Sequence, residues 1–320
     1  MKQSHFKWLK AGVICCMAGV ALIFAGYLKN GQSYVAHTNL NKLNWSAHND
    51  DSTKVISLPR TDLGTLDSIE ITLSDLDLEI LPSGDENCAI AWELSSDYGD
   101  TPVSYTVKDG HLSVTETDHG RNFYVHVDIS LFADLLCGKH ISQSADKVTL
   151  YVPAHAFKAA AINSQFGTVS AEGLQAAQGS IDCVDGDAFF TNCQFSDFTL
   201  QNTLGNLTVS DSTLDDCEIT VSDGDLTLAC NQYQGSCSVT DKLGDVKLTA
   251  SSDILQALRL QLSTGLGEIH LPEELKKTLP ESEDDLTSYS QKGADDDALT
   301  IICKDGDISL TEEHEIDSHH

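Results

Sequence analysis

Apolar and polar residues alternate in short stretches along the second half of the chain, and a glycine precedes each stretch. These glycines are Gly167, Gly186, Gly205, Gly224, Gly244, Gly267 and Gly306. The intervals between them are 19, 19, 19, 20, 23 and 39 residues. A near-constant period of this length is typical of stacked repeats, in which each repeat contacts only its neighbours.

The apolar positions fall into columns when the repeats are superposed on the glycine. Two residues after it stand Val169, Ala188, Leu207, Leu226, Val246, Ile269 and Ile308. Five residues before it stand Ile181, Leu200, Ile219, Val239 and Leu262. Because alternate residues of a strand point to the same side, the columns predict one strand on each side of the glycine. Each repeat is therefore predicted to be a coil of two short strands joined at a glycine corner.

The repeat predicts an all-β fold, a parallel β-solenoid with about 19–20 residues per coil. One coil cannot bury its own apolar face, so neighbouring coils are expected to stack about 4.8 Å apart. An antiparallel stack of hairpins is the structural alternative, because Asp-Gly is also a hairpin turn. The long last interval indicates either a coil without its glycine or an insertion at about 272–299, where the acidic run favours a solvated loop.

The first half has the same alternation without the tight period. Ile69, Ile71 and Leu73 alternate with polar residues, and turn signals such as Ser83-Gly84 and Asp109-Gly110 separate further stretches. This half is predicted to be an irregular opening of the same stack. The strand-repeat domain is therefore expected to cover residues 55–310.

The N-terminal region predicts a membrane anchor. Ala11 to Leu28 is an uncharged, mostly apolar run that would span about 27 Å as a helix, close to the thickness of a bilayer core. Lys2, Lys7 and Lys10 precede it and only Lys29 follows closely, so residues 1–10 are expected in the cytoplasm and the rest outside the cell. A cleaved signal peptide is the alternative. Residues 29–54 are predicted to form a juxtamembrane stalk, and residues 311–320 an acidic, His-containing tail.

The formal net charge is −30, with 49 acidic side chains against 19 Lys and Arg. Such a chain is not expected to bind nucleic acid, because phosphates must be neutralised by Lys and Arg. An anionic lipid surface or wall polymer is disfavoured for the same reason. The acidity is expected to keep an exposed solenoid soluble, while cationic partners and divalent ions remain open.

Eight of the ten cysteines lie outside the apolar run. Cys217 and Cys237 occupy the same column in adjacent coils, and an external location permits disulfides, so this pair is a possible disulfide. Buried free thiols are the alternative, because free Cys behaves as a small hydrophobe. The chain contains no Cys-x-x-Cys spacing, so zinc binding is not supported.

Two groups of carboxylates are candidates for catalysis or for metal binding. Asp75, Asp77 and Glu79 would project from one face of a strand about 7 Å apart, as in a carbohydrate-active enzyme, or they simply form its wet face. Asp-Gly-Asp corners, as at 185–187, 223–225 and 305–307, suggest calcium or, by the interpretation that we favour, ordinary turns. The chain has no nucleotide-binding loop, nucleophile elbow or HExxH motif. We therefore predict no catalytic, cofactor-binding or metal-ligating residue.

A resemblance to a known protein family supports the predicted fold. Lys147-Val-Thr-Leu-Tyr-Val-Pro153, then Ala160-Ala-Ile-Asn-Ser-Gln-Phe-Gly-Thr-Val-Ser170, then serial Gly-Asp-apolar-x-apolar units resemble the putative-adhesin β-strand-repeat family. That family is a bacterial domain of unknown function, often found behind a single membrane helix. The resemblance covers about residues 55–310 and implies the fold, but it brings no catalytic or binding residues.

Together these patterns predict a single-pass bacterial membrane protein that displays an acidic β-solenoid outside the cell. The expected function is a non-catalytic surface interaction module in adhesion or envelope sensing, with an unknown surface or membrane protein as its partner. A carbohydrate-active β-helix enzyme and a calcium-stabilised structural stalk are the two alternatives.

Overall fold

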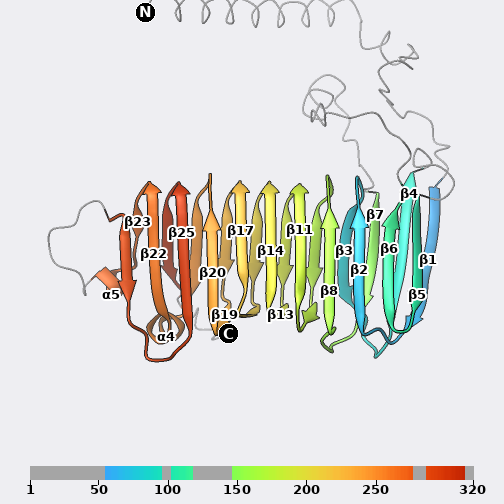
Figure 1. The fold of residues 1–320 in the computed structure, drawn as a ribbon, viewed down its shortest axis with the longest axis horizontal. Helices are drawn as coiled ribbons and strands as arrows, with labels where there is room; N and C mark the ends of the chain where they lie inside the picture. Colours follow the sequence, from blue (N-terminus) through green and yellow to red (C-terminus); the bar gives the residue numbers. More distant parts are fainter. Residues whose placement is uncertain (1–54, 96–101, 118–145, 277–285, 314–320) are drawn as a thin grey trace, which may run out of the picture. The chain divides into compact units, whose positions relative to one another are not determined.

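Short strands stacked in parallel build almost the whole of the described chain (Figure 1). The computed structural model describes residues 55–95, 102–117, 146–276 and 286–313. All of them belong to one compact unit, residues 54–120 and 145–320. The two helices within these residues are short, α4 (Ser252–Ala257) and α5 (Glu273–Lys276).

The strands form three sheets. The first sheet has the spatial order β1 (Val55–Gly64), β4 (Cys88–Ser95), β7 (Lys147–Val152), β3 (Asp77–Pro82), β9 (Val169–Glu172), β12 (Ala188–Thr191), β15 (Leu207–Ser210), β18 (Leu226–Ala229), β21 (Val246–Ala250), β26 (Ile308–Glu312) and β23 (Ile269–His270). The second has the order β24 (Ser288–Gln291), β22 (Arg259–Leu266), β25 (Ala298–Asp305), β20 (Ser236–Asp241), β17 (Glu218–Asp223), β14 (Phe198–Leu204), β11 (Gly179–Asp185), β8 (Ala159–Ser164), β2 (Ser68–Leu73), β6 (His111–Glu116) and β5 (Val103–Lys108). The third consists of β10 (Gln175–Ala176), β13 (Gln194–Ser196), β16 (Thr213–Asp215) and β19 (Gln232–Gln234).

The prediction of an all-β stack of parallel strands is confirmed. Strands of successive central coils pair in register, for example Ile181 with Leu200 and Leu200 with Ile219. Among the described strands, antiparallel pairing is confined to β1–β4, β4–β7, β5–β6 and β22–β24, near the two ends of the stack. The stack of hairpins is therefore not the fold of the repeat region.

The predicted columns fill the interior. Every residue two or four positions after a corner glycine is at most 5% exposed, as Val209 (0%) and Leu310 (5%) illustrate. The column five residues before the glycine is buried as well, at 0–3%. Because each coil places similar side chains above those of the previous coil, the apolar interior continues along the stack.

The prediction of two strands per coil was wrong for the central coils, which have three. The third strand is only two or three residues long and buries one side chain, such as Phe195 in β13. Residues with a left-handed backbone, Asn192 (φ 53°) and Asp197 (φ 46°), bend the chain on either side of β13. Asn and Asp tolerate this conformation better than most side chains, which explains their position at these bends.

The glycines mark a third kind of bend, between the second sheet and the first. A Cβ atom on Gly205 would lie 2.4 Å from the carbonyl oxygen of Gly186 in the neighbouring coil, and the φ angle of Gly205 is +122°. Both the close approach of two coils and the backbone conformation therefore require glycine.

The last interval of 39 residues is explained by strand order. The chain forms β22 and β23, passes through α5 and β24, and then returns to insert β25 between β20 and β22. In the first sheet, β26 inserts between β21 and β23. The expected loop at 272–299 thus contains α5, β24 and the start of β25, and the alternative of a coil without its glycine is wrong.

Several predicted segments lie wholly or partly outside the described residues: the cytoplasmic segment 1–10, the membrane span 11–28, the stalk 29–54 and most of the tail. No helix among the described residues has the length and apolar character needed to span a membrane. The boundary of the tail needs a correction, because Thr311 and Glu312 belong to β26 and extend its parallel pairing with β21.

Candidate functional site

One edge of the stack carries a regular surface pattern, formed by the residue that precedes each corner. We call these eight residues the corner ridge. In spatial order along the stack they are Asp75, Phe166, Asp185, Leu204, Asp223, Leu243, Asp305 and Leu266. Acidic and large apolar side chains therefore alternate from coil to coil.

Strand register establishes the order of the corner ridge. Asp185 pairs with Leu204, and Leu204 with Asp223. At the other end Asp305 pairs with Leu266. Backbone hydrogen bonds establish the order of the remaining members of the corner ridge. Gly224 N–H donates to the carbonyl oxygen of Leu243, and Gly244 N–H donates to that of Asp305.

The first two members follow from the register of β2 and β8. Leu73 pairs with Ser164, so two residues further Asp75 lies beside Phe166. A Cβ atom on Gly167 would clash with the carbonyl oxygen of Leu76, as one on Gly186 would clash with that of Gly167. Leu76 therefore occupies the position in the first coil that a corner glycine occupies in the later coils. The corner ridge therefore begins in the first half of the chain.

The corner ridge is exposed along its length. The apolar members are 47% (Phe166), 44% (Leu204), 51% (Leu243) and 69% (Leu266) exposed. Its four aspartates are exposed as well. Single exposed apolar residues are ordinary on protein surfaces, but four that recur at every second coil of one column form a regular feature that a partner can cover.

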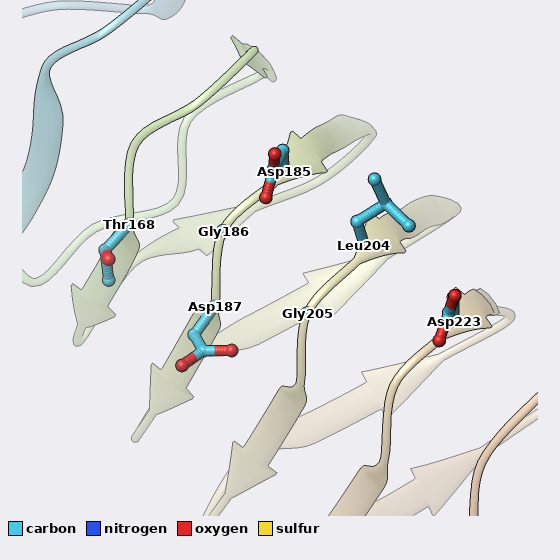
Figure 2. Close-up of a pocket in the computed structure, with 7 residues that line it drawn as sticks. All are labelled: Thr168, Asp185, Gly186, Asp187, Leu204, Gly205 and Asp223. Atoms are coloured by element: carbon cyan, nitrogen blue, oxygen red, sulfur yellow. The ribbon is translucent and has the colours of Figure 1, made fainter. Parts of the chain in front are cut away.

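Figure 2 shows the centre of the corner ridge, where Asp185, Leu204 and Asp223 all point to the same side of the corner. An open depression of about 420 Å³ lies here. It is lined by Thr168, Asp185, Gly186, Asp187, Leu204, Gly205 and Asp223. Because glycines form its floor, backbone is accessible between the side chains of the corner ridge.

A second acidic column, directly after the corner glycines, has a structural role. The Oδ1 atom of Asp187 accepts the backbone N–H of Asn206 at 2.8 Å, and Asn206 Oδ1 accepts that of Asp225 at 2.9 Å. In the same way the backbone N–H of Asp245 donates to Asp225 Oδ1 at 3.0 Å, and that of Asp307 donates to Asp245 Oδ1 at 2.9 Å. The second acid of each Asp-Gly-Asp corner therefore joins neighbouring coils. Among the described residues no cluster of three or more His, Cys, Asp or Glu is arranged to hold a metal ion.

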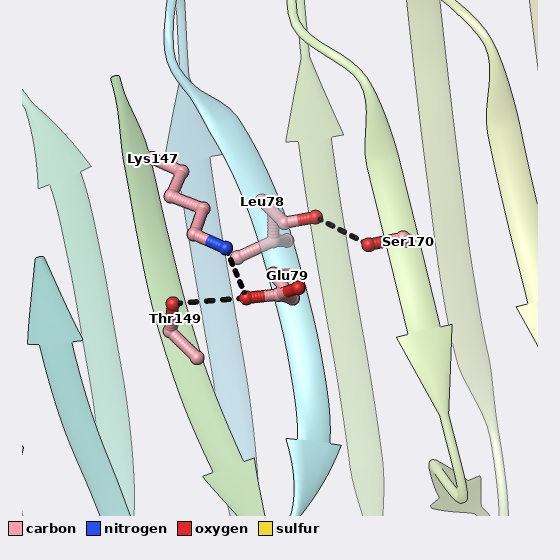
Figure 3. A network of polar contacts seen from close by, with 5 residues as sticks. All are labelled: Leu78, Glu79, Lys147, Thr149 and Ser170. Carbon is pink, nitrogen blue, oxygen red and sulfur yellow. Dashed lines mark hydrogen bonds and ion pairs between the residues drawn. The ribbon is translucent and has the colours of Figure 1, made fainter. Parts of the chain in front are cut away.

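The three carboxylates considered for carbohydrate chemistry do not form a common site. Glu79 accepts hydrogen bonds from Lys147 Nζ at 2.7 Å and Thr149 at 3.3 Å, beside the bond from Ser170 to the Leu78 carbonyl (Figure 3). Asp77 accepts the backbone N–H of Thr168 at 2.8 Å. Asp75 precedes β3 and belongs to the corner ridge, so the expectation of three carboxylates along one strand is wrong.

The residues three positions before each corner point inward, and we call them the inner corner column. They are Ser164, Cys183, Asn202, Val221, Asp241, Cys303 and Thr264. Most of the polar members donate to a corner carbonyl, as Thr264 does to Gly306 at 2.8 Å and Asn202 to Gly186 at 3.2 Å. This column satisfies backbone groups that the glycine corner would otherwise leave without a partner.

Asp241 is the exception in the inner corner column. Its side chain is fully buried, and neither carboxylate oxygen has a hydrogen-bond partner among the described residues. Burial, and then the charges of Asp225 and Asp245, raise the pKa of Asp241 to about 7, although the nearby backbone of Leu243 and Lys242 partly offsets this. Asp241 is therefore a buried acid that gains a proton far more readily than an exposed one.

Cys217 and Cys237 lie opposite each other in neighbouring coils, as the column predicted. Both are buried free thiols in the structure, and their sulfur atoms donate to the carbonyls of Phe195 and Leu214, each at 3.4 Å. Burial raises the pKa of Cys217 to about 12. The disulfide between them remains a prediction.

The corner ridge was not predicted from the sequence. Its signal was the residue directly before each glycine, which alternates in chain order from Phe166 to Leu243. The alternation then fails in chain order, because Leu266 comes before Asp305 in the sequence. Only the inserted position of β25 restores it in space.

Comparison with known proteins gives a family match and distant structural similarity. The family model described as Toastrack DUF4097 matches residues 66–311. No curated protein matches the chain.

Three solved structures illustrate the structural similarity. A putative cell adhesion protein from Clostridium sporogenes is 10% identical, with 82% of this chain and 100% of that chain covered and a TM-score of 0.34. A putative adhesin from Bacteroides fragilis is 12% identical (81% and 98% covered, TM-score 0.36). A putative lipid binding protein from Parabacteroides distasonis is 11% identical (82% and 98% covered, TM-score 0.39).

Proposed function

The chain belongs to the Toastrack DUF4097 family, and we propose that it is a non-catalytic surface interaction module that binds a partner protein through the corner ridge. In this proposal residues 11–28 anchor the chain in the membrane and the strand stack is displayed outside the cell. The module serves adhesion or envelope sensing.

The observation that carries the proposal is the exposure of Phe166, Leu204, Leu243 and Leu266 in one register column. Covering such side chains contributes roughly 25 cal/mol for each Å² of apolar surface that leaves water. The parallel stack holds the column rigidly, so little conformational entropy is lost on binding. A surface of this kind favours a binding function.

The contacts of the carboxylates support a non-catalytic function. Asp77 and Glu79 already hold neighbouring strands together, so a hydrolase mechanism that used them would have to break these contacts. The second aspartates of the glycine corners accept backbone N–H groups with one oxygen, which accounts for their position without calcium.

Site-specific photocrosslinking on intact cells tests the proposal. A photoreactive phenylalanine analogue replaces Phe166 or Leu204 on the corner ridge, and Phe189, which is 41% exposed in β12, serves as the matched control. We expect one surface or membrane protein to be captured from both ridge positions and not from the control. Equal capture from all three positions, or capture from none, would contradict the proposal.

The proposed topology has a separate test. Protease added to intact cells is expected to remove the strand stack, because the chain outside the membrane is accessible. Full protection of the stack in intact cells, with digestion after lysis, would place it on the other side of the membrane.

A further inference from the structure

The spacing of the corner ridge restricts what can bind along it. Neighbouring coils lie about 4.8 Å apart, so like side chains on the corner ridge recur about every 9.6 Å. The acidic members Asp75, Asp185, Asp223 and Asp305 therefore extend over three such intervals, about 29 Å. One exposed apolar side chain lies between each pair of acids and one follows Asp305.

We propose that the corner ridge binds a proline-rich segment of the partner protein in the polyproline II conformation, with a Lys or Arg at every third position. This inference rests on the proposed function and names the chemistry of the partner. About twelve residues of such a segment would cover the corner ridge from end to end.

The repeat of the polyproline II helix matches the corner ridge. It has three residues per turn and a rise of about 3.1 Å, so every third side chain recurs on the same face at about 9.3 Å. Over the three intervals from Asp75 to Asp305 the two spacings differ by only about 0.9 Å in total.

Other regular conformations match less well. In an α-helix the nearest same-face repeat is seven residues, about 10.5 Å, and the mismatch grows to about 2.7 Å over the same three intervals. In a β-strand every third residue points to the opposite face, and every second residue recurs at only about 6.6 Å. Neither conformation matches the spacing of the aspartates as closely as polyproline II does.

The chemistry of the corner ridge also fits this partner. Each Lys or Arg would lie opposite an exposed aspartate, and the two residues between would straddle the intervening Leu or Phe. Proline rings are apolar, and apolar side chains are the usual contacts for polyproline II segments. Because such a segment is already extended before binding, it loses little conformational entropy.

The electrostatic surroundings of the corner ridge reinforce a cationic partner. Among the described residues no hydrogen bond or ion pair engages the carboxylates of Asp185, Asp223 and Asp305. Asp187 runs alongside and brings additional negative charge, whereas Asp225 is paired with Lys247 at 4.0 Å. The chain as a whole carries a formal charge of −30, which excludes an acidic segment.

Fluorescence anisotropy with labelled peptides and the full chain in detergent tests this inference. The probe is a peptide of four Lys-Pro-Pro repeats. The comparison peptide has the same composition, with four consecutive lysines followed by eight prolines. We expect the repeat peptide to bind at least about tenfold more tightly, because only it matches the spacing of the aspartates. Equal affinity of the two peptides would overturn the inference, since charge alone would then explain binding.

Variants locate the binding surface. Combined Asp185→Asn, Asp223→Asn and Asp305→Asn substitutions are expected to weaken binding of the repeat peptide at least about tenfold. The matched control variant changes the net charge by the same amount but at three exposed acids away from the corner: Glu93→Gln, Glu172→Gln and Glu218→Gln. The control should stay within about twofold of the parent chain. A similar loss in both triple variants would overturn the assignment to the corner ridge.

The failure of this inference can be told apart from failure of the proposed function. If photocrosslinking from Phe166 and Leu204 still captures one partner while the repeat peptide shows no preference, the interaction function stands and the polyproline II partner is wrong. If the ridge positions capture nothing, the proposed function itself fails.

Discussion

The buried carboxylate of Asp241 makes the stability of the stack depend on pH in a way that one substitution can isolate. The pKa of Asp241 is about 7 in the folded chain, against about 3.9 for an exposed aspartate. Between these two values the folded state binds one proton more than the unfolded state. Stability therefore falls as pH rises through this window, by about 1.4 kcal/mol for each pH unit.

Asp241→Asn is expected to remove this dependence. Between pH 5 and pH 7 the parent chain should lose about 2.3 kcal/mol of unfolding free energy through Asp241, and the variant should lose none of it. The amide has a precedent two coils away, because Asn202 in the inner corner column donates to the Gly186 carbonyl. Protonated Asp241 can supply the same kind of donor, which is why the neutral form suits this position.

Equilibrium urea unfolding of the full chain in detergent, at pH 5, 6, 7 and 8, measures the effect. The quantity of interest is the difference in unfolding free energy between parent and variant, since other titrating groups cancel in it. Leu204→Ser, on the exposed corner ridge, removes no titratable group, so it is the control and should give a difference that is constant with pH. If the Asp241→Asn difference is equally constant, Asp241 is charged in the folded chain and the reasoning from burial is wrong.

Three further predictions concern the corner and the cysteines. Gly205→Ala should lower the free energy of unfolding in urea by about 3–4 kcal/mol, because its Cβ would lie 2.4 Å from the Gly186 carbonyl oxygen. The control Gly84→Ala, at a position with a positive φ but nothing within 4 Å of the added Cβ, should lower it by only about 1–2 kcal/mol. Equal losses in the two variants would refute the steric explanation. Leu204→Ser should change the free energy of unfolding by less than about 0.5 kcal/mol, because this side chain is 44% exposed. The same substitution should abolish capture of the partner protein. A large loss of stability would show that the Leu204 side chain packs in the folded stack. Mass spectrometry after alkylation without reduction decides the state of Cys217 and Cys237: a disulfide-linked peptide pair confirms the predicted bond, and alkylation of both only after denaturation shows buried free thiols.

Much of the repeat could be read from the sequence because the information is local. Alternation of apolar and polar residues specifies which side of a strand is buried, and residues such as Leu207 and Val209 lie where that pattern places them. The glycine column was visible as a period, although its steric cause was not. The third strand of each coil was missed because two or three residues with one buried side chain carry too little pattern to be recognised.

The candidate site depended on long-range placement. Asp75 and Phe166 are adjacent on the corner ridge but 91 residues apart in the chain. The acids considered from the sequence, Asp77 and Glu79, proved to be occupied by contacts to other strands, which no local pattern reveals.

Composition and local spacing are enough to establish the all-β class, the coil period, the buried columns and the acidic character of the chain, since each depends on residues close together in the chain. Which strands are neighbours is visible only in the folded chain. Insertion of β25 between β20 and β22 places Asp305 between Leu243 and Leu266 and completes the alternation of the corner ridge. Strand order depends on the packing of whole coils against one another, and that free energy is spread over contacts far apart in the chain.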